Sequence, residues 1–285
     1  MLGIVGTVPK EDFPMTCGRV ESKGDHLLIK GRQVEINRGT PSMIAAAVET
    51  LKYMNQSAPY CYLVGDVGDG KGCEKLYRHL IDTLDQTSFN TISFHYFQPD
   101  VHRFRDMMKS IDKIKKRPTL IADAGFMYVA KMAGLAPSFD LFTPDAGELA
   151  YLADEKAPHP FYTRGFILHE ENLVPDLIRR AYEHGNAAVN LLVKGEKDHI
   201  ANQKGILSVV EEPSEENLEP IGGTGDTLTG IVSGLIASGM DLLSACIVAA
   251  KTNRIAGAYA RPTPASQIHQ IIKYIPRALE ELIDQ

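Results

Sequence analysis

The amino-acid sequence predicts a three-layer α/β/α fold with a mostly parallel central sheet. Segments typical of strands alternate with segments of helical periodicity over most of the 285 residues. Several predicted strands are continuous apolar runs, as expected for parallel strands that helices cover on both faces. We find no internal repeat, low-complexity segment or linker, so we expect residues 1–285 to form a single domain.

In the first half of the chain, predicted strands and helices follow one another with short connections. Apolar or β-branched runs predict strands at 2–8, 26–29, 60–64, 90–97, 119–122 and 139–142. Apolar residues at helical spacing predict helices at 40–54, 74–84, 99–115, 126–133 and 146–153. Gly3, Gly6 and Pro9 weaken the first strand, whereas Pro41 supports the start of the first helix.

The second half of the chain continues the alternation and ends in helices. The predicted elements are, in order, a break at 158–161, a strand or loop at 166–168, a helix at 173–183, a strand at 188–193, a hairpin of 199–200 with 206–210, an acidic loop at 211–219, a helix after residue 225, and helices at 242–259 and about 268–282.

A glycine-rich stretch immediately before a helix is the most informative part of the sequence. Gly222, Gly223, Thr224 and Gly225 precede apolar residues that recur at helical spacing, namely Leu228, Ile231, Val232, Leu235 and Ile236. Glycine permits positive φ and a close approach of the backbone to a ligand. Because the first N–H groups of a helix have no partner within it, this loop predicts an anion-binding site.

Asp226 lies in the first turn of that helix and has two interpretations. An acidic residue there can simply favour the start of the helix. It can also act as a base beside a bound phosphate and take a hydroxyl proton during phosphoryl transfer.

Polar residues at the ends of predicted strands favour the functional interpretation. Asp123, Asp145, Glu148 and Lys194 all follow predicted strands, as the glycine loop follows a hairpin. Ligands of open α/β sheets bind beyond the carboxyl ends of the strands, so these side chains can converge on one edge.

Each of these residues also has a purely structural interpretation. Asp123 can anchor a loop, and Lys194 can belong to a turn after a buried strand instead of placing an ammonium near phosphates. Asp145 can cap a helix with Glu148 in its first turn. Alternatively, the two carboxylates can supply the hard oxygen ligands of Mg²⁺.

The stretch Gly222-Gly223-Thr224-Gly225-Asp226-Thr227-Leu228-Thr229-Gly230 resembles the signature of the ADP/ATP-dependent NAD(P)H-hydrate dehydratases, which belong to the ribokinase-like superfamily. Shorter pieces occur in the order of that family. They are Ser22 to Ile29, similar to "KGDxGxVLI"; Ile121 to Gly125, similar to "(L/A)DA(G/D)A"; Thr143 to Glu148, similar to "TPHPGE"; and Val193 to Gly195, similar to "LKG". The glycine loop is the specific part of a resemblance that runs from about Ser22 to the C-terminus.

The resemblance implies a ribokinase-like fold with ATP or ADP as co-substrate and Mg²⁺ as the metal. Asp226 would be the catalytic base, and the backbone N–H groups of Gly223, Thr224 and Gly225 would stabilise the charge of the transferring phosphoryl group. Glu148 would be the candidate Mg²⁺ ligand, because many ribokinase-like proteins carry N-x-x-E at the equivalent place. The other residues implied near the nucleotide or its phosphates are Gly222, Lys194, Gly195 and Asn253.

Three segments depart from the family pattern. Lys30 to Gln33 stand where the family has a glycine-rich "GGS" segment, and the acidic residues 211–219 replace its "NxTGN" stretch. Asp145-Ala146 replaces the His-Pro of "TPHPGE", so a role of that histidine does not carry over. The sequence therefore retains the phosphate-handling parts but alters the region expected to hold the acceptor, as in a divergent member.

Composition and motif searches exclude several other classes. The net charge of −6 argues against a nucleic-acid binder. The sequence shows neither a signal peptide nor an apolar run long enough for a membrane span, so we expect a cytoplasmic protein without membrane contact. The four cysteines form no CxxC pair, which favours free thiols. Residues 65–71 match G-x-x-x-x-G-K, but Gly72 replaces the Ser or Thr that a P-loop needs.

Three functions remain after this comparison. The first is ATP- or ADP-dependent dehydration of NAD(P)H hydrate, in which phosphorylation turns a hydroxyl into a leaving group and elimination restores the nicotinamide. The second is a kinase that phosphorylates a hydroxyl of another small metabolite. The third is a non-catalytic nucleotide-binding protein. In each case the partner is a small molecule, and the family's frequent homo-oligomers allow a homo-oligomer here.

Overall fold

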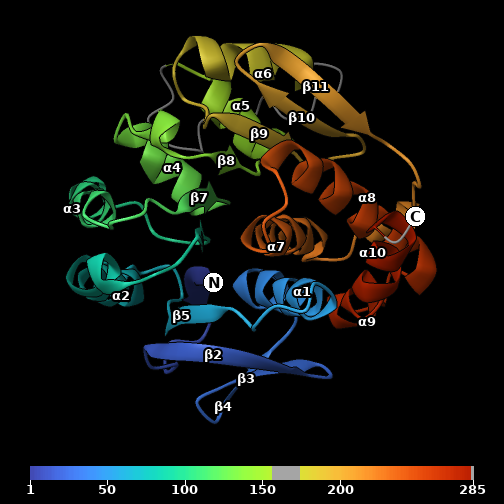
Figure 1. The fold of residues 1–285 in the computed structure, drawn as a ribbon, viewed down its shortest axis with the longest axis horizontal. Coiled ribbons are helices and arrows are strands. Elements are labelled where there is room, and N and C mark those ends of the chain that lie inside the picture. Colours follow the sequence, from blue (N-terminus) through green and yellow to red (C-terminus); the bar gives the residue numbers. More distant parts are fainter. Residues whose placement is uncertain (156–173, 284–285) are drawn as a thin grey trace.

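The computed structural model describes residues 1–155 and 174–283, and their strands form one 11-stranded sheet (Figure 1). The strand order is β11-β10-β9-β8-β7-β6-β1-β5-β2-β3-β4. The central strands pair in parallel and are β9 (Asn190–Val193), β8 (Leu141–Phe142), β7 (Thr119–Ala122), β6 (Thr91–Phe94), β1 (Leu2–Val8) and β5 (Tyr60–Gly65). The antiparallel flanks are β10 (Asp198–Asn202) with β11 (Gly205–Val210), and β2 (Thr16–Lys23) with β3 (His26–Ile29) and β4 (Arg32–Glu35).

Helices cover both faces of this sheet and confirm the three-layer α/β/α prediction (Figure 1). One face carries α1 (Thr40–Tyr53), α7 (Thr224–Ala237), α8 (Leu242–Ala260), α9 (Ile268–Ile272) and α10 (Ile275–Ile283). The other face carries α2 (Lys71–Thr83), α3 (Val101–Asp112), α4 (Gly125–Met132), α5 (Ala146–Ala153) and α6 (Val174–Glu183). The buried apolar side chains divide into two clusters, one on each side of the sheet.

Helix α7 is buried along almost its whole length and packs closely on α1. A Cβ added at Gly230 would lie 2.2 Å from the carbonyl oxygen of Met43, and one at Gly234 would lie 2.9 Å from Cβ of Thr50. Only glycine fits where two helix backbones approach this closely. The contact fixes the first turn of α7, and with it the glycine loop, at one end of the sheet.

The N-terminal strands differ most from the sequence prediction. The first strand, which Gly3 and Gly6 appeared to weaken, is β1 at the centre of the parallel sheet. Its glycines are required by close neighbours, since a Cβ at Gly6 would lie 2.5 Å from Oγ1 of Thr40. Strand β2 was not predicted, because its buried positions alternate with polar ones and include only one large apolar residue, Val20.

Two smaller differences concern the ends of elements. The helix predicted at 99–115 is shorter, as α3 begins after Asp100, whose side chain accepts from the N–H of Arg103. The last predicted helix is divided into α9 and α10. The predicted break at 158–161 and the strand or loop at 166–168 lie outside the described residues.

Candidate active site

The polar residues that follow predicted strands meet at the carboxyl ends of the parallel strands. Asp123 directly follows β7, Lys194 directly follows β9, and a parallel bridge joins Asp145 to Lys194 beyond the end of β8. The N-terminal part of α7 reaches the same edge, because Thr229 in its second turn donates a hydrogen bond of 2.6 Å to Oδ2 of Asp123. The expected convergence of these segments therefore occurs in the structure.

Asp226 lies in the first turn of α7 with both carboxylate oxygens engaged. Oδ2 accepts a hydrogen bond of 2.6 Å from the backbone N–H of Gly39, and Oδ1 lies 2.9 Å from Nε2 of His95. Burial alone would raise the pKa of Asp226. The hydrogen bond with His95 and the charge of Lys194 outweigh burial and lower that pKa below its usual value. The carboxylate is therefore held ionised, which is the form that a base needs.

Asp123 and Lys194 form a buried ion pair beside Asp226. Nζ of Lys194 lies 2.8 Å from Oδ1 of Asp123, and the two side chains are 12% and 1% exposed. Burial alone would lower the pKa of Lys194, but the carboxylates of Asp123 and Glu148 raise it above its usual value. The ammonium also lies next to the glycine loop, since a Cβ at Gly225 would be 3.6 Å from Nζ. A single cation thus pairs with the carboxylate and lies beside the loop.

The glycine loop has the features of an anion site at a helix N-terminus. Among the described residues, no side chain caps α7, whereas Asp100, Asp145 and Asp241 cap α3, α5 and α8. The residue before α7, Gly223, has φ of +103°, and a Cβ there would lie 2.9 Å from Oγ of Ser42. The first N–H groups of α7 are thus left for an external acceptor, which the positive end of the helix dipole also favours.

Asn253 and Gly195 brace the loop and the lysine. Oδ1 of Asn253 accepts from Thr227 over 2.6 Å, and its Nδ2 donates to the carbonyl oxygen of Thr224 over 3.1 Å, which ties α8 to the start of α7. Arg254 pairs with Asp198 and donates to the carbonyl oxygen of Gly195. These contacts are structural, and the nucleotide-binding role of Asn253 and Gly195 stays a prediction.

Asp145 and Glu148 cap a helix, as the structural interpretation of these residues predicted. Oδ1 of Asp145 accepts from the N–H of Glu148, and Oε2 of Glu148 accepts from the N–H of Asp145, which is a capping box at the start of α5. Burial and the neighbouring Asp145 carboxylate raise the pKa of Glu148 well above its usual value. Each carboxyl group keeps one oxygen outside the capping box, so the proposed Mg²⁺ role stays a prediction that the geometry permits.

Sequence reasoning missed His95 and Arg38. His95 follows the end of β6 and is fully buried, with Nδ1 3.0 Å from Oγ1 of Thr40 and Nε2 against Asp226. The same signal that identified Asp123, a polar residue just past a strand, would have found it if the strand had been ended at Phe94. Arg38 is exposed beside the loop, and a Cβ at Gly222 would lie 3.5 Å from its Cδ. No sequence signal indicated Arg38.

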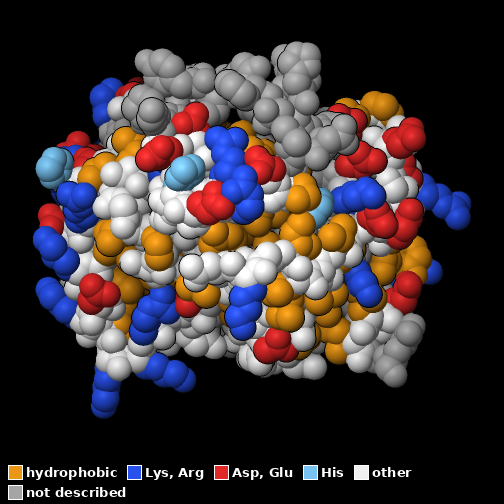
Figure 2. Space-filling view, turned by 90° about the horizontal axis from the view of Figure 1, so that it is seen from above, with side chains coloured by type: hydrophobic (Ala, Val, Ile, Leu, Met, Phe, Trp, Pro, Cys, Tyr) orange, Lys and Arg blue, Asp and Glu red, His pale blue; other side chains and the backbone are white. Residues whose placement is uncertain are grey.

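The acidic segment 211–219 lies on the outside of the protein near α8. Its five glutamates are exposed or half-buried, and Glu211 pairs with Lys197 at 2.5 Å. Leu218 anchors the segment, because a Cβ at Gly257 of α8 would lie 2.4 Å from Cδ1 of Leu218. In the view of Figure 2, acidic and basic side chains are interspersed over the displayed face.

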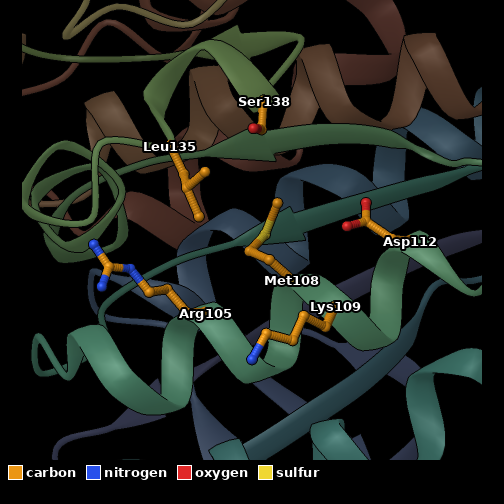
Figure 3. A pocket seen from close by; sticks show the side chains of 6 residues that line it. All are labelled: Arg105, Met108, Lys109, Asp112, Leu135 and Ser138. Carbon is orange, nitrogen blue, oxygen red and sulfur yellow. The ribbon is translucent and has the colours of Figure 1, made fainter.

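Two cavities in the described part of the chain lie outside this cluster. One, of about 300 Å³, lies between α3 and the segment after α4, where Arg105, Met108 and Leu135 are among its lining residues (Figure 3). The second, of about 280 Å³, lies at the loop 68–70 before α2 and includes Gln98 and Arg103. The residues 65–71 that resemble a P-loop line this second cavity in part, and Asp66 accepts hydrogen bonds from the N–H groups of that loop.

Fold and site together define an α/β protein with an uncapped helix N-terminus, a lysine and a carboxylate at the edge where such proteins bind ligands. The chain belongs to the family of NAD(P)H-hydrate dehydratases (Carb_kinase), whose model matches residues 105–277. Its fold is ribokinase-like. Within residues 1–155 and 174–283, no helix is both long enough and apolar enough to cross a membrane.

Three relatives illustrate the breadth of this similarity. The uncharacterized protein MJ1337 of Methanocaldococcus jannaschii is 41% identical over 242 residues, which cover 85% of this chain and 100% of that protein. The ADP-dependent (S)-NAD(P)H-hydrate dehydratase of Cenarchaeum symbiosum is 30% identical over 139 residues, covering 49% and 43% of the two chains. The structure of the ADP/ATP-dependent NAD(P)H-hydrate dehydratase of Bacillus subtilis has a TM-score of 0.58 at 13% identity, covering 98% and 89%; at this identity the likeness concerns the fold.

Proposed function

We propose that the protein catalyses ADP- or ATP-dependent dehydration of NAD(P)H hydrate. The observation that carries this proposal is the ionised carboxylate of Asp226 in the first turn of α7, directly after a glycine loop whose N–H groups are not capped by a described side chain. This arrangement supports a base and an anion site within one helical turn. Family membership supports the same activity.

In this proposal, Asp226 accepts the proton of the hydrate's hydroxyl as that oxygen takes the terminal phosphoryl group of the nucleotide. The N–H groups of Gly223, Thr224 and Gly225 stabilise the charge on the phosphoryl oxygens, and Lys194 adds an ammonium at Gly225. The phosphorylated oxygen then leaves as inorganic phosphate, and elimination restores the dihydronicotinamide ring. The chain's own groups thus bind, orient and deprotonate.

Mg²⁺ would be held by the carboxyl oxygens of Asp145 and Glu148 that the capping box leaves unused. A bound cation would oppose the burial and the Asp145 charge that now raise the pKa of Glu148, and so favour its ionised form. When bound, Mg²⁺ supplies neutralisation of the phosphate charge.

A kinase acting on another hydroxylated metabolite is the second candidate. The segment from Lys30 to Gln33 departs from the family's glycine-rich pattern. It includes the tight turn between β3 and β4, with positive φ at Lys30 and Gly31. The acidic segment 211–219 is tied to the outside of the protein. Both features support an altered acceptor region beside an intact phosphate apparatus, and they equally motivate a non-catalytic nucleotide-binding role.

One coupled assay separates the candidates. Purified protein is incubated with hydrated NADH, Mg²⁺ and either ADP or ATP, and the return of NADH absorbance and the release of phosphate are followed together. We expect both signals with one of the nucleotides. A phosphorylated product without NADH recovery would instead identify a kinase, and nucleotide binding without turnover of any acceptor tested would identify a binding protein.

The matched pair Asp226→Asn and Asp241→Asn tests the role of the base. Both residues lie at helix starts, but Asp241 caps α8, which begins at Leu242 just after the opposite end of α7. We expect Asp226→Asn to abolish turnover while nucleotide binding and folding persist, and Asp241→Asn to retain turnover. Full activity of Asp226→Asn would remove Asp226 from the mechanism.

A further inference from the structure

Three atoms that could ligate a metal ion, from three separate segments, lie close together at the site. They belong to His95 after β6, Asp123 after β7 and Asp226 in α7, and one donor atom of each lies within 4.8 Å of the other two. Nε2 of His95 is 2.9 Å from Oδ1 of Asp226 and 3.6 Å from Oδ2 of Asp123. In a tetrahedral ion site with ligand bonds of about 2.1 Å, two donors are roughly 3.4 Å apart. The two measured separations bracket that value.

The other polar atom of each side chain is held by the surrounding protein. Nδ1 of His95 lies 3.0 Å from Oγ1 of Thr40, Oδ1 of Asp123 accepts from Lys194, and Oδ2 of Asp226 accepts from the backbone N–H that precedes α1. Metal-binding histidines and carboxylates in proteins have just such outer partners, which fix the orientation of each ligand. Oδ2 of Asp123 also accepts a hydrogen bond of 2.6 Å from Thr229, so it would ligate an ion through its second lone pair, beside Nε2 of His95 and Oδ1 of Asp226.

The charges at this position favour a cation. His95 is 0% exposed, Asp123 1% and Asp226 14%, so two carboxylates are largely withdrawn from water. Lys194 pairs with Oδ1 of Asp123 and compensates one negative charge. Carboxylates removed from water require pairing or coordination, and an imidazole nitrogen among oxygen donors favours first-row transition ions over Mg²⁺.

We propose that His95, Asp123 and Asp226 form a binding site for one divalent transition-metal ion of the Zn²⁺, Mn²⁺ or Co²⁺ type. The inference goes beyond the proposed function, because it rests on the donor geometry and needs no particular acceptor. With three protein ligands, the ion keeps at least one position for water or for an acceptor hydroxyl, whose deprotonation it would promote.

The test measures metal binding alone, without nucleotide or acceptor, so that its failure is distinct from failure of the dehydratase assay. The intact chain is stripped with a chelator and titrated separately with Co²⁺ and with Zn²⁺, followed by the visible spectrum of Co²⁺ and by calorimetry. We expect one bound equivalent with the spectrum of a nitrogen- and oxygen-ligated ion. Mg²⁺ at the same concentration is expected not to displace it.

Variants locate the bound ion. His95→Gln and Asp123→Asn are expected to lose the tight equivalent, and Thr40→Val, which removes only the outer partner of the histidine, to weaken binding about 10- to 100-fold. The matched control is His26→Gln, which removes a half-buried histidine paired with Asp25 at 3.0 Å, away from the proposed site, and is expected to bind like the wild type.

Folding of each variant is checked by circular dichroism. If His95→Gln fails to fold, the nearly isosteric Asp226→Asn takes its place. Absence of a bound equivalent in the wild type would overturn the proposal, and the contact of His95 with Asp226 would then be a hydrogen bond only. Binding that survives in both His95→Gln and Asp123→Asn would overturn it as well.

Discussion

Replacing Lys194 by methionine tests the ion pair at the centre of the site. The substitution keeps the length of the side chain but removes the ammonium 2.8 Å from Asp123, whose carboxylate is 1% exposed. Removing one partner of a buried pair leaves an uncompensated charge and costs about 3–5 kcal/mol. At about 2–4 °C per kcal/mol for a chain of this size, we expect the melting temperature to fall by about 6–20 °C.

Urea unfolding and thermal denaturation of the apo protein measure this effect. The matched control is Lys71→Met, which removes an ammonium from an exposed pair with Asp69 and should change the stability little. The double variant Lys194→Met with Asp123→Asn should be more stable than the sum of the single changes indicates, because the amide needs no cation. A loss no larger for Lys194→Met than for Lys71→Met would refute the claim that the pair is buried and coupled.

Two further predictions concern the loop and the base. Gly223→Ala should lower nucleotide affinity in calorimetry and destabilise the protein more than Gly239→Ala does. Both glycines have φ near +100°, but only a Cβ at Gly223 would meet a neighbour, Oγ of Ser42 at 2.9 Å. Equal losses of stability would contradict a steric role of Gly223. Asp226 has a lowered pKa, so its stabilisation is complete above its unfolded-state pKa of about 3.9 and is lost as the pH falls through the lower folded-state pKa. Urea unfolding over an acid pH series should therefore show a smaller pH dependence in Asp226→Asn, and identical profiles would contradict the assignment.

The layers of the fold were predictable from local patterns, whereas the sheet order was not. Alternating strand and helix periodicities gave the three layers, because each pattern reflects burial on a known face. The central place of β1 depends on close contacts of Gly3 and Gly6 with Phe89 and Thr40, which are distant in sequence. A glycine in a strand is interpreted as weakening that strand unless the neighbour that requires it is known.

The site was predictable where a side chain follows a strand directly. Asp123 and Lys194 each do so, and the shared edge of parallel strands brought them together. Contacts made through the backbone gave no such signal. The N–H of Gly39 binds Asp226 from 187 positions away, and Arg38 lies beside Gly222 for the same topological reason. Such residues are identified by the packing of α1 on α7, which no local pattern encodes.

The position of the imidazole distinguishes this site from the sequence pattern that it resembles. Where that pattern has histidine, this chain has Asp145, whose Oδ1 is committed to capping α5 through Glu148. The imidazole at the site comes instead from His95 after β6 and contacts Asp226 directly. Because the side chain of Asp145 faces the start of α5 while His95 faces α7, the two positions are not interchangeable. In the proposed function, the acid–base chemistry would depend on the carboxylate of Asp226 and its imidazole neighbour as one unit, and we expect a variant of either to alter the other.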